Sequence, residues 1–92
     1  MINSFKHKGL EQFFYNGNQK GIPSNQAKKI RIRLEVINAA TVIDDIDKPG
    51  WDLHQLTGNR IGIWSIKVTG NYRITFRFID GDAFEVDYED YH

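Results

Sequence analysis

Residues 61–88 read IGIWSIKVTGNYRITFRFIDGDAFEVDY, and this stretch decides the fold. Three runs rich in β-branched and aromatic residues, 61–68, 72–79 and 83–88, are expected to be strands. Thr69-Gly70-Asn71 and Asp80-Gly81-Asp82 stand between them, and such triplets favour tight hairpins. Apolar and polar side chains alternate in the last two runs, so each strand has one apolar face. We therefore predict an antiparallel sheet with one apolar face, to which Phe84, Val86 and Tyr88 contribute.

Strand pairing predicts which polar residues share the open face of this sheet. Directly opposed residues of an antiparallel pair lie on the same face. If the apolar faces are brought together, Arg73 lies opposite Asp87 or Glu89. The preceding hairpin sets Lys67 beside Arg73, or Thr69 in a slipped register. The open face is expected to carry Lys67, Arg73, Arg77 and, if the last strand stays regular, Tyr91.

Apolar residues at helical spacing predict a short helix that ends at Asn16-Gly17 and a longer amphipathic helix over residues 23–40. They are Leu10, Phe13 and Phe14 in the first helix, and Ala27, Ile30, Leu34 and Ile37 in the second. The basic run Lys28, Lys29, Arg31 and Arg33 is expected on a solvated helix face. Residues 2–6 predict a short strand and residues 44–51 a loop. The fold class is therefore α+β: two helices cover one face of the sheet, and the other face is open and polar.

The composition limits what kind of protein this is. The 92 residues suit one domain spanning 1–92, and the hydrophobic content of 40% with 26% charged residues suits a globular chain. There is no cysteine, which excludes disulfides, thiol nucleophiles and cysteine-based zinc sites. No signal peptide or membrane span is visible, so we expect a cytoplasmic protein. The net charge is zero, which suits a conventional nucleic-acid binder poorly.

Histidine and arginine residues are the first candidates for chemistry. His54 lies between Leu53 and Leu56, and it is either an exposed strand or loop residue or a general base or phosphate contact. Arg73 is either part of a solvated ion pair or a bidentate phosphate clamp. Arg60, Lys67 and Arg77 add weak support for a polyanion on that face. No two of the three histidines have helical metal-ligand spacing, so neither a metal site nor a cofactor is expected.

The last three residues, Asp90-Tyr91-His92, allow two interpretations. Chain ends are often frayed, which is the plainer interpretation. Alternatively, Tyr91 and His92 act in proton transfer, and Asp90 orients an imidazole.

Several segments together resemble the HigB toxins of the RelE/ParE superfamily, over essentially the whole chain. The matching segments are residues 2–10, Leu53-His54-Gln55-Leu56, Gly58-Asn59-Arg60, Trp64-Ser65-Ile66, residues 71–76 and Asp90-Tyr91-His92. The resemblance implies the RelE-like fold and a type II toxin neutralised by a HigA antitoxin. It also implies a helix-turn-helix antitoxin, so that operator DNA is bound only through the toxin–antitoxin complex. The implied activity is ribosome-dependent cleavage of mRNA in the A site, and the positions that match are His54, Arg73, Asp90, Tyr91 and His92. Relatives often carry Lys where this chain has Thr57, so one phosphate contact is missing or is supplied by Arg60.

Such an activity needs little apparatus, because RNA carries its own 2′-hydroxyl nucleophile. A base, an acid and a cation for the phosphate are enough, and no metal is required. We assign Arg73 to the phosphate and His54 and His92 to base and acid, in either order. Tyr91 is expected to stack on a base or to assist proton transfer, and Asp90 to orient His92.

Three alternatives remain open at this point. A ParE-like protein would share the fold and inhibit DNA gyrase without being a nuclease. A non-catalytic protein-binding module would tolerate the loss of His54 and His92. A free-standing RNA-binding protein fits the zero net charge poorly, because binding to an RNA backbone relies on positive charge.

Overall fold

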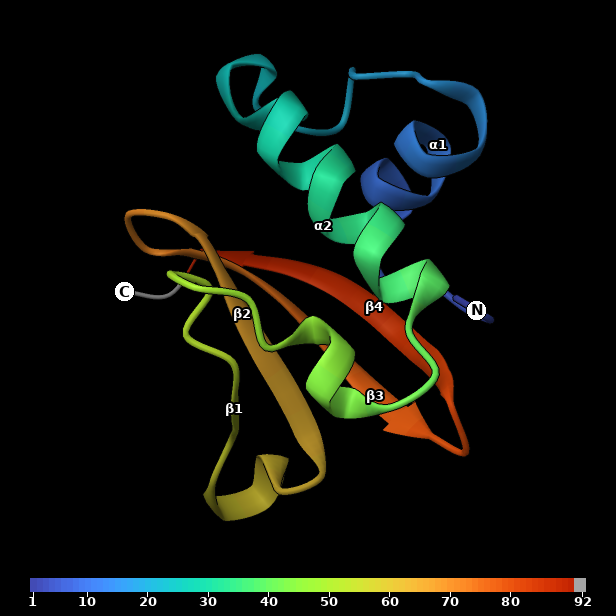
Figure 1. Ribbon diagram of the computed structural model, residues 1–92. Helices are drawn as coiled ribbons and strands as arrows, with labels where there is room; N and C mark the ends of the chain where they lie inside the picture. The colour runs from blue at the N-terminus through green and yellow to red at the C-terminus, as the bar shows by residue number, and fades with distance from the viewer. Residues whose placement is uncertain (91–92) are drawn as a thin grey trace.

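The computed structural model describes residues 1–90, which form two layers (Figure 1). The helical layer consists of α1 (Lys8–Asn16), the 3-10 turn η1 (Ser24–Gln26) and α2 (Ala27–Ala39). The other layer is an antiparallel sheet of β1 (His54–Gln55), β2 (Ile63–Thr69), β3 (Tyr72–Ile79) and β4 (Asp82–Asp90), in that spatial order. Two further 3-10 turns, η2 (Ile43–Ile46) and η3 (Gly58–Arg60), stand before and after β1. The predicted α+β architecture, with two helices on one face of the sheet, is confirmed.

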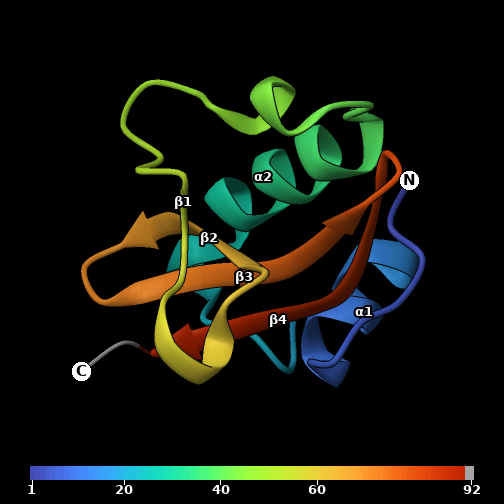
Figure 2. The same cartoon turned by 90° about the horizontal axis from the view of Figure 1, so that it is seen from below.

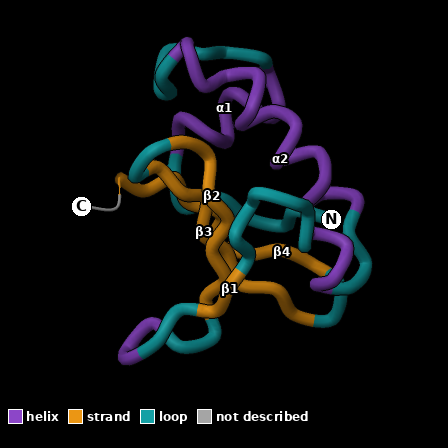
Figure 3. Tube along the Cα trace, turned by 60° about the vertical axis from the view of Figure 1, so that its left-hand side comes forward, coloured by secondary structure: helices purple, strands orange, loops and turns teal. Residues whose placement is uncertain are grey.

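The core lies between the layers and contains the residues that the helical spacing predicted except Phe14, which is partly buried against it. All four apolar positions of the longer predicted helix are buried, together with Leu10 and Phe13 of α1. They pack against apolar residues of the sheet, notably Ile66, Ile74 and Phe76. Gly17 ends α1 in the left-handed conformation, with a φ of 72°, and its amide donates to the carbonyl of Phe13. Figure 3 shows α1 and α2 on one side of the strands and the turn η3 on the other.

Arg33 departs from the expectation of a solvated helix face. Its side chain is buried, its guanidinium lies 4.6 Å from the centre of the Trp51 ring, and its Nε donates to the carbonyl of Lys67 over 2.8 Å. Burial lowers the pKa of Arg33, because a charge is less well solvated inside the protein. The prediction that the whole basic run faces solvent is wrong at Arg33, because the buried face of α2 includes Arg33 as well as the neighbouring Leu34. A planar guanidinium can stack on an aromatic ring there while its N–H groups stay satisfied.

The N-terminal segment lies along the outer edge of β4, opposite β3. It makes two parallel bridges, Ile2 with Ala83 and Phe5 with Val86. Backbone amides of Asn3 and Lys6 donate to the carbonyls of Ala83 and Val86 over 2.8 and 2.9 Å. The predicted strand over 2–6 is therefore present as two separate bridges to the sheet.

A β-bulge in β4 explains why those bridges are separate, and it overturns one prediction. The register of β3 and β4 shifts between Thr75 and Arg77, and Glu85 has a φ of 53°. Because of the extra residue, Phe84 pairs with Arg77 on the open face, while Ala83 and Val86 are both fully buried. The expectation that Phe84 shares a face with Val86 and Tyr88 is thus wrong. Simple alternation cannot reveal an inserted residue.

Two other boundaries differ from the sequence prediction. Residues 44–51 are not wholly a loop, because η2 forms where the Asp45 carboxylate accepts from the amides of Thr41 and Val42 over 3.0 and 3.3 Å. These two hydrogen bonds keep the pKa of Asp45 below its usual range. The strand predicted from residue 61 begins at Ile63, since Gly62 turns the backbone with a φ of 93°. Within residues 1–90, no helix has the length and apolar character needed to cross a bilayer.

Candidate functional site

Three of the predicted site residues, His54, Lys67 and Arg73, lie in two neighbouring cross-strand rows of the four-stranded sheet, whose arrangement Figure 2 shows from below. In one row Lys67 pairs with Arg73, and Arg73 pairs with Glu89. This confirms one of the two registers expected on each side of Arg73. The neighbouring row runs His54, Ser65, Thr75 and Asp87, across all four strands. Because directly opposed residues share a face, His54 and Arg73 lie on the same side of the sheet, one row apart.

Asp52 connects these two residues, and sequence reasoning gave it no role. Its Oδ2 lies 3.4 Å from Nη2 of Arg73 and 3.8 Å from Nδ1 of His54. The Asp52 side chain is 60% exposed, whereas that of Arg73 is 17% exposed. Asp52 reaches this position with a φ of 52°, a conformation that Asp tolerates better than most residues. A backbone angle of this kind has no plain signature in sequence, so the role of Asp52 could be found only in the structure.

The backbone of Asp52 also selects the tautomer of the neutral His54 ring. The carbonyl oxygen of Asp52 lies 2.8 Å from Nδ1 of His54. A carbonyl can only accept, so this contact requires the proton to be on Nδ1. In the neutral imidazole the lone pair is then on Nε2, which can act as a base.

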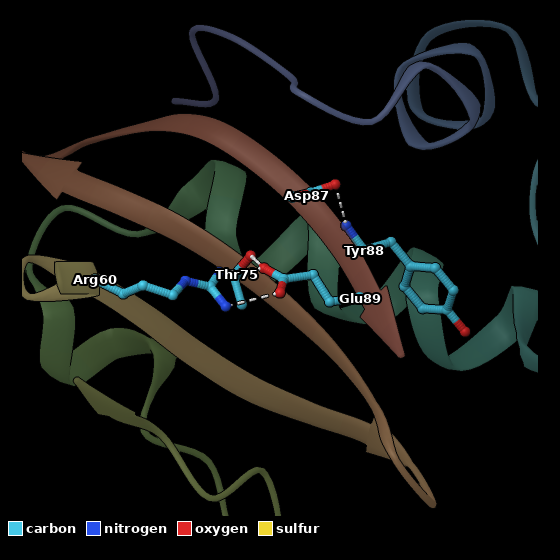
Figure 4. A network of polar contacts seen from close by, with 5 residues as sticks. All are labelled: Arg60, Thr75, Asp87, Tyr88 and Glu89. Atoms are coloured by element: carbon cyan, nitrogen blue, oxygen red, sulfur yellow. Dashed lines mark hydrogen bonds and ion pairs between the residues drawn. The ribbon is translucent and has the colours of Figure 1, made fainter. Parts of the chain in front are cut away.

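On the open face, the carboxylate of Glu89 accepts hydrogen bonds from both Arg60 and Thr75 (Figure 4). Arg60 binds it in a bidentate manner: Nη1 donates to Oε1 over 2.9 Å and Nη2 to Oε2 over 2.5 Å. The hydroxyl of Thr75, a residue only 2% exposed, donates to Oε2 over 2.5 Å. Hydrogen bonding from Arg60, and then from Thr75, holds the pKa of Glu89 below its usual range despite partial burial. Arg73 thus faces Glu89 in register, while Glu89 pairs with Arg60.

The predicted basic cluster is balanced by carboxylates on the same face. Arg77 Nε lies 2.8 Å from the Glu85 carboxylate at the bulge. Arg60, Arg73 and Arg77 therefore each contact an acidic side chain. A pocket on this face is bordered by Lys6, Arg60, Thr75, Arg77, Asp87 and Glu89. The surface has alternating charges, and a phosphate would have to compete with a carboxylate for each of these arginines.

Of the remaining predicted residues, the structure describes Asp90 but not the two that follow it. Asp90 is the last residue of β4 and pairs with Tyr72. Tyr91 and His92 lie outside the described residues. Thr57, which stands where relatives often carry Lys, is exposed and precedes η3. Among residues 1–90, no three His, Asp or Glu side chains gather as potential metal ligands.

Comparison with known proteins identifies the family. The family model described as RelE-like toxin of type II toxin-antitoxin system HigB matches residues 3–92. The chain is 49% identical, over the full length of both proteins, to a protein of Proteus vulgaris named Endoribonuclease HigB. It is 36% identical over 85 residues, or 90% of each chain, to Toxin HigB-1 of Vibrio cholerae serotype O1. With a family match over nearly all of its length and a two-layer fold of the expected kind, this chain belongs to the HigB-like toxins of type II toxin-antitoxin systems.

Proposed function

We propose that this toxin is an endoribonuclease that cuts mRNA in the A site of the ribosome. The observation that carries the proposal is the joint placement of Arg73 and His54 on the open face, with Asp52 in contact with both. A guanidinium beside an imidazole suits phosphate chemistry, because one holds the phosphate charge and the other moves a proton. The printed name of the Proteus vulgaris relative supports ribonuclease activity.

The proposed reaction uses the nucleophile that RNA carries. A base takes the proton of a 2′-hydroxyl, and the oxygen attacks the adjacent phosphorus. The bond to the 5′-oxygen breaks as an acid protonates that oxygen, which leaves a 2′,3′-cyclic phosphate and a 5′-hydroxyl. Arg73 stabilises the charge on the phosphate oxygens, and no metal ion is needed on this route.

Side-chain roles follow from the same scheme. His54 and His92 serve as base and acid, in either order. The hydrogen bond from Nδ1 of His54 to Asp52 leaves Nε2 for the proton transfer. Asp90 orients His92, and Tyr91 stacks on a base or assists the transfer. Lys67 and Arg77 contact neighbouring phosphates, whereas Arg60, the third basic residue that the sequence predicts for this role, binds the Glu89 carboxylate.

The balanced charge of the open face supports delivery of the substrate by the ribosome. Unaided binding to an RNA backbone depends on an excess of positive charge. This chain has a net charge of zero, and its arginines on that face meet carboxylates. The small ribosomal subunit would therefore present the mRNA, and cleavage would take place in the cytoplasm. Membership of a type II family implies an antitoxin partner. We propose a helix-turn-helix antitoxin of the HigA kind, through which the complex contacts operator DNA.

The test is induced expression in a bacterial cell with the 5′ ends of mRNA mapped. Wild type should create new cuts within translated codons, and Arg73→Ala should create none. Arg31→Ala is the matched control, because Arg31 is an exposed arginine of α2 and it should cut like wild type. Growth arrest with intact mRNA would overturn the proposal and point to gyrase, which a supercoiling assay would check. Cleavage by a folded Arg73→Ala variant would overturn the site assignment.

A further inference from the structure

Arg60 and Glu89 join two distant parts of the open face. Arg60 ends the turn η3, which connects β1 to β2, whereas Glu89 is the next-to-last residue of β4. In the sheet order β1-β2-β3-β4, the strands that η3 connects are at one side of the sheet, and β4 is the edge strand at the other side. The side chain of Arg60 therefore reaches across the sheet, with Thr75 of β3 beneath the contact (Figure 4). The bidentate geometry fixes the orientation of the pair as well as its distance.

The same end of β4 is also held from the helical side. The hydroxyl of Tyr88 donates to the side-chain oxygen of the buried Gln26 in η1. The Tyr88 ring stacks on Tyr72, with 5.3 Å between ring centres and an angle of 8°. Burial raises the pKa of Tyr88, so this hydroxyl stays protonated and able to donate. The strand is thus anchored on both faces directly before Asp90.

Both ends of the Arg60–Glu89 contact adjoin the proposed catalytic residues. His54 begins β1, six positions before Arg60. Asp90 follows Glu89 directly, and Tyr91 and His92 are the next residues in the sequence. Any contact that ties η3 to the end of β4 therefore sets the spacing between His54 and Asp90.

We propose that Arg60 and Glu89 form a positioning clamp, which holds the β1–η3 segment against the end of β4, and that Arg60 is not a phosphate ligand. The clamp rests on the proposed function, since its role is to align His54 with Asp90. A phosphate that took Arg60 would leave the Glu89 carboxylate, with a side chain only 21% exposed, without its cation. Such a loss is costly for a partly buried charge. A phosphate would displace Asp52 from Arg73 more easily, because the contact between Arg73 and Asp52 is longer and the Asp52 carboxylate is largely exposed.

The first test is a double-mutant cycle with Arg60→Gln, Glu89→Gln and the double variant. Single-turnover cleavage of mRNA is measured on programmed ribosomes at several toxin concentrations. Each single variant should lower the maximal rate by roughly 10- to 100-fold, the loss that misplaced catalytic groups cause. The KM should not change, and the double variant should be no slower than either single one. Glu35→Gln on the exposed side of α2 controls for the change in charge and should keep the wild-type rate.

A phosphate-binding Arg60 predicts a different pattern, and that pattern would overturn the clamp. Arg60→Gln would then raise the KM, whereas Glu89→Gln would free the guanidinium and lower the KM. Additive losses in the double variant would also contradict a single unit. Arg60→Lys retains the charge without the bidentate fork, so the clamp predicts only partial retention of the rate.

Amide hydrogen exchange tests the clamp without any cleavage. Arg60→Gln and Glu89→Gln should each speed exchange both in η3 and at Glu89 and Asp90, while the amides of α2 stay protected. Exchange that rises at only one of these sites, or at neither, would overturn the clamp. If wild type cuts no mRNA, the proposed function fails, and the exchange result alone decides whether the two segments are coupled.

Discussion

At the scale of single residues, Asp52 is the most informative side chain that sequence reasoning passed over. It pairs with the arginine proposed to hold the scissile phosphate, and its backbone carbonyl sets the His54 tautomer. The two roles use different atoms. The carboxylate competes with a phosphate for Arg73, whereas the carbonyl is present whatever the side chain is.

This separation predicts that Asp52→Asn strengthens substrate binding. The variant removes the negative charge beside Arg73 and keeps both the side-chain shape and the carbonyl contact with His54. Exposed ion pairs contribute about 0.2–1 kcal/mol, so the KM for mRNA on the ribosome should fall by about 1.5- to 5-fold with a similar maximal rate. Asp47→Asn, at an exposed position between η2 and Asp52, is the charge-matched control and should leave the KM unchanged. A fall in the maximal rate with Asp52→Asn would mean that the carboxylate itself positions His54.

At the scale of elements, β4 contains an irregularity that changes which residues face the core. The bulge at Glu85 turns Phe84 to the open face and divides the N-terminal segment into two bridges. Beyond the bulge the strand is regular, and Glu89 points to Arg60 rather than to its cross-strand partner Arg73. One strand thus carries an edge contact, a bulge and an ion pair in succession.

The tie between η3 and β4 predicts a specific pH dependence of stability. The pKa of Glu89 is lower in the folded state than in the unfolded chain, chiefly because of Arg60. The ionised carboxylate therefore stabilises the fold above the unfolded pKa of about 4.3, and this contribution is lost as the pH falls through the folded pKa. The free energy of unfolding of Glu89→Gln should lie below that of wild type at pH 7, and the gap should narrow below about pH 4.3. Urea unfolding at a series of pH values measures this, and a gap that is constant with pH would contradict it.

At the scale of the whole molecule, Arg33 connects the helical layer to the segment that leads into β1. Its guanidinium stacks on Trp51 and donates to the carbonyl of Lys67, and the amide of Lys67 donates to the carbonyl of Trp51 over 2.7 Å. A residue of α2 thereby holds both β2 and the chain just before Asp52.

Loss of Arg33 should therefore destabilise the protein, although Arg33 is a charged residue on a helix. Arg33→Met removes the cation–π contact and leaves the Lys67 carbonyl without this donor, which should cost about 1–3 kcal/mol in the free energy of unfolding. Lys28→Met, at an exposed position of the same helix, should change it by less than about 0.5 kcal/mol. Chemical denaturation compares the two. Equal effects would mean that Arg33 contributes no more than a solvated side chain.

Much of this architecture could be predicted from the sequence, because its determinants are local. Strand alternation, glycine-centred turns and helical spacing are properties of neighbouring residues, and they predicted both helices and the hairpins, with two possible registers on each side of Arg73. The face that carries Arg73, Lys67 and Arg77 followed from parity alone. The family also followed from sequence, since its motifs extend along the whole chain in order.

What only the tertiary structure decided involves residues far apart in the chain or backbone angles outside the common regions. The Arg60–Glu89 pair spans 29 positions, and the contact of Arg33 with Lys67 spans 34. Asp52 and Glu85 adopt positive φ angles that neither residue type requires. The backbones of Gly9 and Gly21 approach so closely that a Cβ on Gly9 would lie 2.6 Å from the carbonyl oxygen of Gly21. The sequence determined which face would carry the charges; the tertiary fold decided how they pair, because Coulomb and hydrogen-bond energies depend on distances that local patterns do not specify.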